Sequence, residues 1–174
     1  MNIILCGLPL SGKSHFAKLL SEYLGWPLID TDRQLEKLYK TENKQSLTAS
    51  DIYRLKGETF FRDLERRAIA SISHSEKTII ALGGGALTNP DNVSVIKQLG
   101  TLIYLETEID VLIERMKKKN EIPAYLNAKD PENSFRQLAK SRIPVYESYS
   151  DATVNTKGLK DIEVVASICR YMLN

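Results

Sequence analysis

A glycine-rich loop near the start of the chain carries the clearest chemistry. Residues 7–14 read Gly-Leu-Pro-Leu-Ser-Gly-Lys-Ser and fit the pattern G-x-x-x-x-G-K-[S/T]. Glycines let the backbone curl so that several N–H groups point at one anion, and the helix that follows directs its positive end there. In this pattern Lys13 reaches the β- and γ-phosphates of a nucleotide, and the Ser14 hydroxyl binds Mg²⁺. The alternative is a glycine turn that merely joins a strand to a helix.

The flanking segments favour the nucleotide interpretation. Residues 2–6 form an apolar run, as expected of a buried parallel strand, and residues 13–24 repeat apolar side chains at helical spacing. A GTPase would also carry an N-K-x-D motif, which the sequence lacks, and a motor ATPase would need a longer chain. The expected contacts with ATP lie in the loop and the first helical turn: Gly7, Leu8, Pro9, Leu10, Ser11, Gly12, Lys13, Ser14 and His15. Of these, the His15 side chain is expected at the surface.

Two carboxylates follow the second predicted strand, residues 27–30. Asp30 and Asp32 come at its carboxyl end, the edge at which open parallel sheets bind ligands. One carboxylate can hold a water of the Mg²⁺ shell, and the other can accept a hydrogen bond from a substrate hydroxyl and position it for in-line attack. For one of them, the competing interpretation is a cap on the next helix. The pair as a whole favours a kinase of a small molecule.

Two later features are weaker by themselves. Gly83, Gly84 and Gly85 follow a predicted strand, where consecutive glycines suit close approach of a ligand to the backbone or a flexible turn. Arg62 stands early in a predicted helix, a position at which arginine is usually a solvated surface residue.

The order and spacing of these motifs resemble the shikimate kinase family from residue 3 to about residue 156. Beside the glycine-rich loop, the match includes Leu28-Ile29-Asp30-Thr31-Asp32, Gly57-Glu58-x-x-Phe61-Arg62-x-x-Glu65, Gly83-Gly84-Gly85-Ala86 and Arg142-x-Pro144-x-Tyr146. The resemblance implies transfer of the γ-phosphoryl group of ATP to the 3-hydroxyl of shikimate, with Mg²⁺ and with ADP and shikimate 3-phosphate as products. It also implies a step in chorismate and aromatic amino acid biosynthesis.

The resemblance implies roles on the acceptor side of the reaction. Asp32 would contact the substrate hydroxyls, including the one that is phosphorylated, and would act in catalysis with Lys13. Arg62 and Arg142 would clamp the substrate carboxylate, because a guanidinium matches a carboxylate with two parallel hydrogen bonds. The glycines 83–85 would line the shikimate pocket, with their N–H groups facing the ligand.

On the donor side, the resemblance implies two further contacts. Arg115 would lie against the adenine of ATP. Asp30 would belong to the magnesium shell through water, together with the Ser14 hydroxyl.

One position departs from the family pattern. The lid of the family carries an Arg-Pro-Leu-Leu stretch whose arginine reaches over the ATP phosphates, whereas this chain has Ile122 followed by Pro123, Ala124 and Tyr125. Isoleucine cannot offset charge in the transition state, so another cation could substitute, the register of the lid could be shifted, or the enzyme could be slow or altered in substrate. Our hypothesis is substitution by Lys119, with Lys117, Lys118 and Arg136 as other candidates. The competing interpretation is that the basic run 117–119 stabilises a helix end.

Alternating elements predict the fold class. Strands are expected at 2–6, 27–30, 78–82, 101–105 and 152–154, and helices at 13–24, 34–39, 51–73 with a break at Gly57, 89–98, 109–119, 134–141 and 161–172. This order predicts an α/β protein with a parallel sheet covered on both faces. The resemblance implies a five-stranded sheet and the nucleoside-monophosphate-kinase-like fold. We expect one domain over residues 1–174, with a substrate-binding region at about 32–62 and a mobile lid at about 117–131.

Composition excludes several other classes. The 24 basic and 22 acidic residues give a net charge of +2, which offers no electrostatic case for nucleic acid. No apolar run approaches the length of a membrane span, and the first ten residues lack the basic start and cleavage site of a signal peptide. The only cysteines, Cys6 and Cys169, suit a reducing compartment, so we expect a cytoplasmic protein. From the family we expect a monomer.

Two alternatives to shikimate phosphorylation stay open. The chain could phosphorylate another small hydroxy acid or sugar acid, such as gluconate, since a pair of arginines indicates only a carboxylate. It could also be an accessory module that binds ATP with little turnover, an alternative that the missing lid arginine keeps open. A nucleoside-monophosphate kinase fits less well, because the acceptor side carries a carboxylate-binding pattern.

Overall fold

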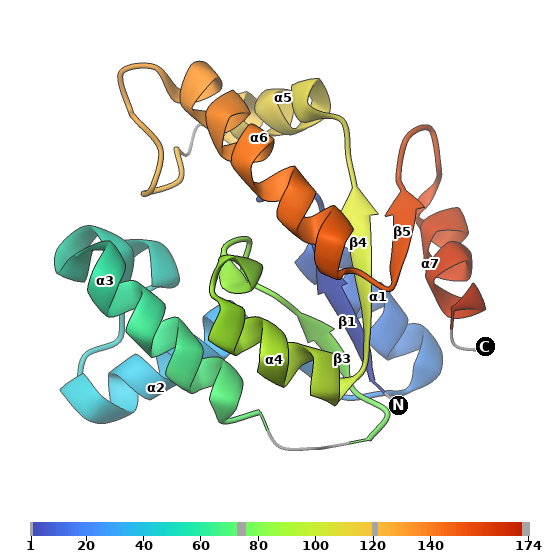
Figure 1. Cartoon of the computed structure of the whole chain (residues 1–174), viewed down its shortest axis with the longest axis horizontal. Coiled ribbons are helices and arrows are strands. Elements are labelled where there is room, and N and C mark those ends of the chain that lie inside the picture. Colours follow the sequence, from blue (N-terminus) through green and yellow to red (C-terminus); the bar gives the residue numbers. More distant parts are fainter. Residues whose placement is uncertain (1, 73–75, 120–121, 172–174) are drawn as a thin grey trace.

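A five-stranded parallel sheet forms the centre of the computed structural model, which describes residues 2–72, 76–119 and 122–171 (Figure 1). In the order β2-β3-β1-β4-β5 the strands are Leu28–Asp30, Ile79–Ala81, Ile3–Cys6, Thr101–Glu106 and Ala152–Asn155. Every neighbouring pair is parallel. The predicted α/β fold with a five-stranded parallel sheet is confirmed.

Helices cover both faces of the sheet. Adjacent residues of a strand point to opposite faces, so Ile3 and Leu5 pack with α1 (Lys13–Leu24) and α7 (Asp161–Arg170). Ile4 and Cys6 pack on the other face with η1 (Ala86–Thr88), α4 (Pro90–Leu99), α5 (Ile109–Lys119) and α6 (Pro131–Tyr149). This double burial explains why β1 is apolar at every position.

A smaller helical layer extends from the edge strand β2. α2 (Thr31–Asn43) and α3 (Ala49–Ala70) enclose a hydrophobic cluster of their own, which includes Tyr39 and Phe61. Figure 1 shows these two helices at one end of the molecule, with α5 and α6 at another. The helical backbone of α3 is broken at Gly57, where φ is 80°, as the sequence predicts. This break separates the start of α3 from the part that carries Arg62.

Two helices differ most from the predicted bounds. α2 begins at Thr31 rather than at residue 34, because the Asp30 carboxylate caps it, and it ends at Asn43 rather than at residue 39. α6 spans 131–149 rather than 134–141 and contains Pro144. Its buried side chains, among them Phe135 and Tyr146, hold the helix against the core, and packing of this kind overrides a local breaker. The predicted helix ends at residues 73 and 172 lie outside the described residues.

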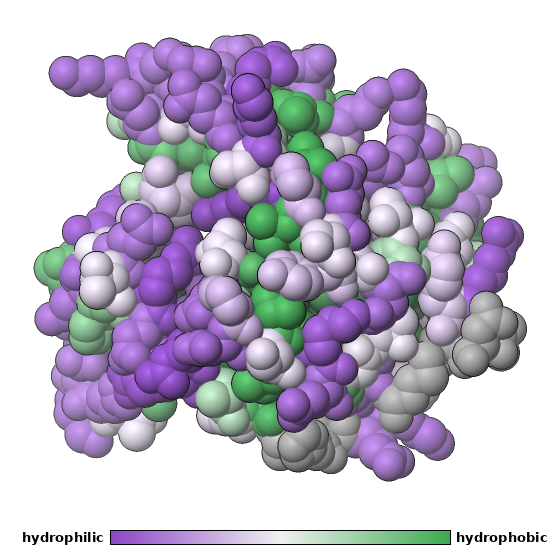
Figure 2. Space-filling model, viewed as in Figure 1, coloured by the Kyte–Doolittle hydropathy of each residue, from purple (hydrophilic) through white to green (hydrophobic). Residues whose placement is uncertain are grey.

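The connection between α5 and α6 has no regular structure in its described part. Residues 122–130 form turns, and Leu126 is buried in the core beneath α6. Figure 2 shows that the face in view is mostly hydrophilic over α2 and α3, with hydrophobic residues in a narrow central band. None of the helices in the described part of the chain has the length and apolar character needed to cross a membrane.

Candidate active site

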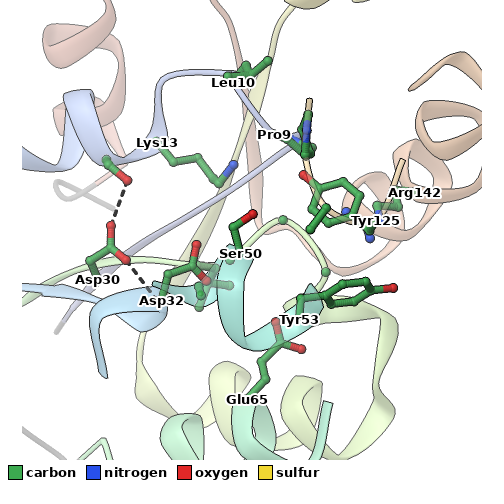
Figure 3. A pocket seen from close by; sticks show the side chains of 18 of the residues that line it. Pro9, Leu10, Lys13, Asp30, Asp32, Ser50, Tyr53, Glu65, Tyr125 and Arg142 are labelled. Atoms are coloured by element: carbon green, nitrogen blue, oxygen red, sulfur yellow. Dashed lines mark hydrogen bonds between the residues drawn. The ribbon is translucent and has the colours of Figure 1, made fainter. Parts of the chain in front are cut away.

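One cavity of about 620 Å³ collects most of the predicted site residues. Its walls come from the glycine-rich loop, the start of α2, both parts of α3, the turn after β3, the end of α5, the segment 122–130 and α6. Figure 3 shows Lys13, Asp30 and Asp32 on one side and Tyr53, Tyr125 and Arg142 on the other. The cavity therefore lies at the carboxyl ends of the strands, as the sequence predicts.

The loop 7–14 holds its lysine tightly. Leu10 adopts a left-handed backbone conformation with φ of 67°, which is uncommon for a residue other than glycine, and Gly12 has φ of 92°. The Lys13 ammonium donates to the carbonyl oxygens of Gly7 at 3.0 Å and Leu8 at 2.8 Å. Burial lowers the pKa of Lys13 to about 8, although Asp32 acts in the opposite direction. An ammonium has three donors, so one N–H remains for a ligand.

The predicted ATP contacts divide into two groups. Those that line the cavity are Pro9, Leu10, Gly12, Lys13, Ser14, His15 and Arg115. Gly7, Leu8 and Ser11 are not among the lining residues, because Leu8 packs into the core and Gly7 lies against β4. A Cβ atom on Gly7 would lie 2.8 Å from the carbonyl oxygen of Leu105.

Two ionisable side chains border the loop. The Arg115 guanidinium donates to the Leu10 carbonyl oxygen at 2.9 Å and so supports the strained part of the loop. His15 Nε2 lies 2.7 Å from Asp161 Oδ2, at the start of α7. Arg115 therefore reaches the donor side of the cavity from α5.

Asp30 serves two purposes in the structure. Its Oδ1 atom accepts hydrogen bonds from the backbone N–H groups of Asp32 at 3.0 Å and Arg33 at 3.3 Å, which caps α2. Its Oδ2 atom accepts from the Ser14 hydroxyl at 2.8 Å. The helix cap is thus real for Asp30, and the same carboxylate also joins the glycine-rich loop to β2.

Asp32 lies in the first turn of α2 and lines the cavity. The pKa of Asp32 is raised to about 6, chiefly by burial and also by the nearby carboxylates of Asp30 and Glu65, while Lys13 acts in the opposite direction. A carboxyl group tuned in this way titrates close to neutral pH, where it can accept a proton from a substrate hydroxyl.

Each glycine of the turn after β3 makes room for a different side chain. A Cβ atom on Gly83 would lie 2.6 Å from Asp32 Oδ1, and one on Gly85 would collide with the Arg62 guanidinium. On Gly84 it would lie 3.3 Å from Pro9 and 3.4 Å from Arg142 Nη1. All three glycines line the cavity, so any side chain here would displace a predicted site residue.

The expectation that all three glycine N–H groups face a ligand is wrong for one of them. The Gly83 N–H donates to the Thr31 hydroxyl oxygen at 2.8 Å, which fixes the turn against α2. The Gly84 carbonyl oxygen accepts from the Tyr146 hydroxyl at 2.5 Å, so α6 fixes the turn from the other side. The glycine turn is therefore held from two sides.

The two predicted carboxylate-binding arginines differ in their partners. Arg62 donates to Glu65 at 2.9 Å and has Glu58 at 3.7 Å. Arg142 is 7% exposed and lines the cavity, yet it forms no ion pair with any carboxylate of the described residues. Its charge acts on the Glu65 carboxylate from a distance. A buried guanidinium that forms no ion pair is costly, so a ligand carboxylate is its natural partner.

The basic residues near the missing lid arginine also separate. Lys118 and Lys119 line the cavity, whereas Lys117 pairs with Glu132 at 2.6 Å and Arg136 pairs with Asp110 at 2.6 Å. Ile122, which stands at the position of the missing arginine, packs against the hydrophobic core. Of the four candidates, only two lie at the cavity.

Several lining residues were not predicted as part of the site, and three of them carry a carboxylate or an aromatic ring with a hydroxyl. Tyr53 and Glu65 come from α3, and Tyr125 comes from the segment 122–130. Glu65 belongs to the motif that starts at Gly57 and resembles the family, but the resemblance was not used to predict a role for it. The aromatic side chain directly after Pro123-Ala124, in the stretch that stands where the family has its Arg-Pro-Leu-Leu motif, is the signal that could have indicated Tyr125.

Comparisons with known proteins agree with this geometry. A model of the shikimate kinase family matches residues 9–173. The shikimate kinase of Persephonella marina is 34% identical over 167 residues, covering 96% of each chain. That of Dehalococcoides mccartyi is 35% identical over 167 residues, which are 96% of this chain and 90% of the relative.

Solved structures give the same result. Shikimate kinase from Acinetobacter baumannii in complex with shikimate superimposes with a TM-score of 0.87 at 29% identity, covering 99% of this chain and 92% of the other. A gluconokinase from Sinorhizobium meliloti shares only the fold, with a TM-score of 0.56 at 18% identity. With the family model matched over nearly the whole chain, this protein belongs to the shikimate kinase family.

Proposed function

We propose that this protein transfers the γ-phosphoryl group of ATP to the 3-hydroxyl of shikimate. The observation that carries the proposal is the buried Arg142, which lacks an ion-pair partner among the described residues and lines the same cavity as Lys13 of the glycine-rich loop. One cavity thus offers a cradle for nucleotide phosphates and a place for a small carboxylate. Family membership supports shikimate as that carboxylate.

The acceptor carboxylate would bind between Arg142 and Arg62. Arg62 is held by Glu65, which is itself buried, so its guanidinium is pre-oriented before a ligand arrives. Paired N–H groups on both arginines suit the planar carboxylate. The ring hydroxyls of shikimate would then face Asp32, which lies beside Gly83.

Asp32 and Lys13 would perform the transfer. The Asp32 carboxylate accepts a hydrogen bond from the acceptor hydroxyl and takes its proton as the oxygen attacks the γ-phosphorus. The bond from the γ-phosphorus to the bridging oxygen breaks, and ADP leaves. Lys13 offsets charge on the β- and γ-phosphate oxygens throughout, which is the main protein contribution to phosphoryl transfer.

The donor side also fits Mg²⁺. The Ser14 hydroxyl and the Asp30 carboxylate lie 2.8 Å apart and both line the cavity. Mg²⁺ prefers oxygen ligands and is usually bound by one or two carboxylates together with substrate phosphates and water. Ser14 would bind the ion directly and Asp30 through water, and the ion would supply further neutralisation of phosphate charge.

Lys118 or Lys119 would take the place of the family's lid arginine and offset charge on the ATP phosphates. With Arg115, these lysines occupy positions i, i+3 and i+4 of α5, which is one face of a helix, and all three line the cavity. Lys117 points elsewhere, to Glu132. This arrangement keeps our hypothesis for Lys119 and adds Lys118 as its equal, while it removes the motivation for Lys117 and Arg136.

The direct test is ADP release by the purified protein with ATP and Mg²⁺, with shikimate, gluconate or no acceptor. We expect strong stimulation by shikimate and none by gluconate. Stimulation by gluconate and not by shikimate would show that gluconate, rather than shikimate, is the acceptor. Tight ATP binding without stimulation by either acid would favour the accessory module.

We further propose that the protein acts as a cytoplasmic monomer with one domain over residues 1–174. Two free cysteines and a nearly balanced net charge support this setting. Sedimentation at assay concentrations checks the oligomeric state.

A further inference from the structure

Three aromatic rings, here called the aromatic array, cross the acceptor side of the cavity. Tyr53 packs edge-on against Phe61 with ring centroids 5.4 Å apart, and against Tyr125 with centroids 6.1 Å apart. Phe61 and Tyr53 belong to α3 on either side of Gly57, whereas Tyr125 belongs to the segment 122–130. The aromatic array therefore joins two parts of the chain that are far apart in sequence.

Each end of the aromatic array carries an arginine. The Arg62 guanidinium carbon lies 5.5 Å from the Phe61 ring centroid, and that of Arg142 lies 5.3 Å from the Tyr125 ring centroid. These are the two groups that face the acceptor carboxylate in the proposed function. Both distances are within the range in which a cation is attracted to a ring face.

Arg142 depends on this contact more than Arg62 does. Arg62 is fixed by the Glu65 carboxylate at 2.9 Å, but Arg142 has no carboxylate partner among residues 2–72, 76–119 and 122–171. Gly84 limits it on one side, and Tyr125 faces it on another. Burial raises the pKa of Tyr125 well above its usual value, so the ring stays neutral and keeps an electron-rich face toward the guanidinium.

We propose that Tyr125 is a positioning residue for the acceptor, which orients Arg142 and links acceptor binding to the placement of the segment 122–130. The inference rests on the proposed function. The Tyr125 ring can contact both Tyr53 and Arg142 only while the segment 122–130 lies against α3. Binding of a carboxylate to Arg142 in this orientation and placement of the segment must therefore favour each other, since coupling between two equilibria is reciprocal. Each of the two contacts of Tyr125, with Tyr53 and with Arg142, is strong enough to shift such an equilibrium by roughly two- to tenfold.

The first test distinguishes the effect of the aromatic ring of Tyr125 from the effects of its hydroxyl and of its apolar volume. Tyr125→Leu is expected to raise the KM for shikimate by roughly five- to twentyfold, with kcat and the KM for ATP changed by less than about threefold. Tyr125→Phe keeps the ring and should stay within about twofold of the parent enzyme. Tyr149→Leu, which removes a partly exposed tyrosine from the same helix as Arg142, is the matched control.

A second test reads the coupling directly. Hydrogen exchange of residues 122–130 is measured with and without saturating shikimate, in the absence of nucleotide. Shikimate should slow exchange in the parent enzyme and in Tyr125→Phe, but not in Tyr125→Leu. Unchanged ATP affinity would show that the Leu variant is folded.

The outcomes separate this inference from the proposed function. A parent enzyme that shikimate stimulates, together with a Tyr125→Leu variant of normal KM and normal protection, would overturn the role of Tyr125 alone. Equal defects in Tyr125→Phe and Tyr125→Leu would also overturn it, because the hydroxyl and not the ring would then act. No stimulation of the parent enzyme by shikimate would overturn the proposed function, and the role of Tyr125 with it.

Discussion

The donor side and the acceptor side of the cavity are built in opposite ways. The donor side is made largely of one stretch of the chain, in which Pro9, Leu10 and residues 12–15 line the place for phosphates. The acceptor side is made of single residues from α2, both parts of α3, the glycine turn, the segment 122–130 and α6. On the donor side, Lys13 is held by carbonyl oxygens of its own loop. On the acceptor side, side chains of distant segments hold each other.

This difference predicts different responses to substitution. A loop fixed by its own backbone should tolerate changes elsewhere in the chain. An assembly of distant side chains should be sensitive to any member that positions another. Arg142 tests this contrast most severely, because it is buried and forms no ion pair with a carboxylate of the described residues.

Arg142→Lys is expected to raise the KM for shikimate by roughly 30- to 100-fold, since a lysine cannot reproduce two parallel hydrogen bonds to a carboxylate. The affinity for ATP should change by less than about threefold, because the donor side is built separately. Steady-state kinetics with each substrate varied in turn gives both values.

Arg62→Lys is the matched comparison for this prediction. Its charge stays close to Glu65, so a smaller rise of roughly tenfold or less is expected. A larger effect at Arg62 than at Arg142 would break the argument that the unpaired arginine dominates carboxylate binding.

The lysines at the end of α5 should act mainly on kcat. Lys118→Ala and Lys119→Ala remove cations that line the donor side, and we expect one of them to lower kcat by roughly tenfold or more. Lys117→Ala is the control, because Lys117 pairs with Glu132 away from the cavity. If all three variants keep the parent kcat, the basic run only stabilises the helix end, and the donor side works without a substitute for the lid arginine.

The sequence predicts the fold because its signals are local. β1 is apolar at every position, the order of strands and helices fits βαβ units, and α5 has the predicted bounds 109–119. The errors concern helix ends. α2 starts early because a cap depends on the direction of the Asp30 side chain, and α6 continues through Pro144 because tertiary packing holds it. Neither effect can be read from residue order alone.

The two sides of the cavity differ in the same way in how well the sequence predicts them. The loop 7–14 is a continuous pattern, so its residues could be named directly. The reason for Gly85 is the Arg62 guanidinium that lies against it, and the reason for Tyr125 is its contact with Tyr53 and Arg142. Such contacts join segments that only the fold brings together, and no spacing rule in one sequence reports them.

The pH dependence of kcat/KM should report both sides of the cavity. Asp32, with a pKa raised to about 6, must be ionised to accept the substrate proton, and Lys13, with a pKa lowered to about 8, must be protonated. The value of kcat/KM should therefore rise through pH 6, fall above pH 8, and be roughly tenfold below its maximum at pH 5. Since the two groups interact, the apparent pKa values belong to the pair. A profile that stays flat from pH 5 to 7 would contradict the role of Asp32.

The smallest effect expected is a gain in stability when Asp32 is replaced. The folded protein raises the pKa of Asp32 from 3.8 to about 6, chiefly by burial. Between these pH values the unfolded chain has released a proton that the folded chain still binds, so stability falls as the pH rises through this window and stays lowered above it. Asp32→Asn removes the buried carboxylate and should raise the free energy of unfolding at pH 7.5 by about 1 to 2 kcal/mol.

Urea unfolding of Asp32→Asn at pH 7.5 and at pH 4 checks both the size and the sign of this effect. The gain should shrink at pH 4, where the folded parent protein already carries a neutral Asp32. Glu22→Gln on the exposed face of α1 is the control and should change little. A variant less stable than the parent at pH 7.5 would mean that the carboxylate makes favourable contacts that outweigh its burial. A variant that is more stable and inactive would show that the acceptor side gives up stability to hold an ionised group at the reacting hydroxyl.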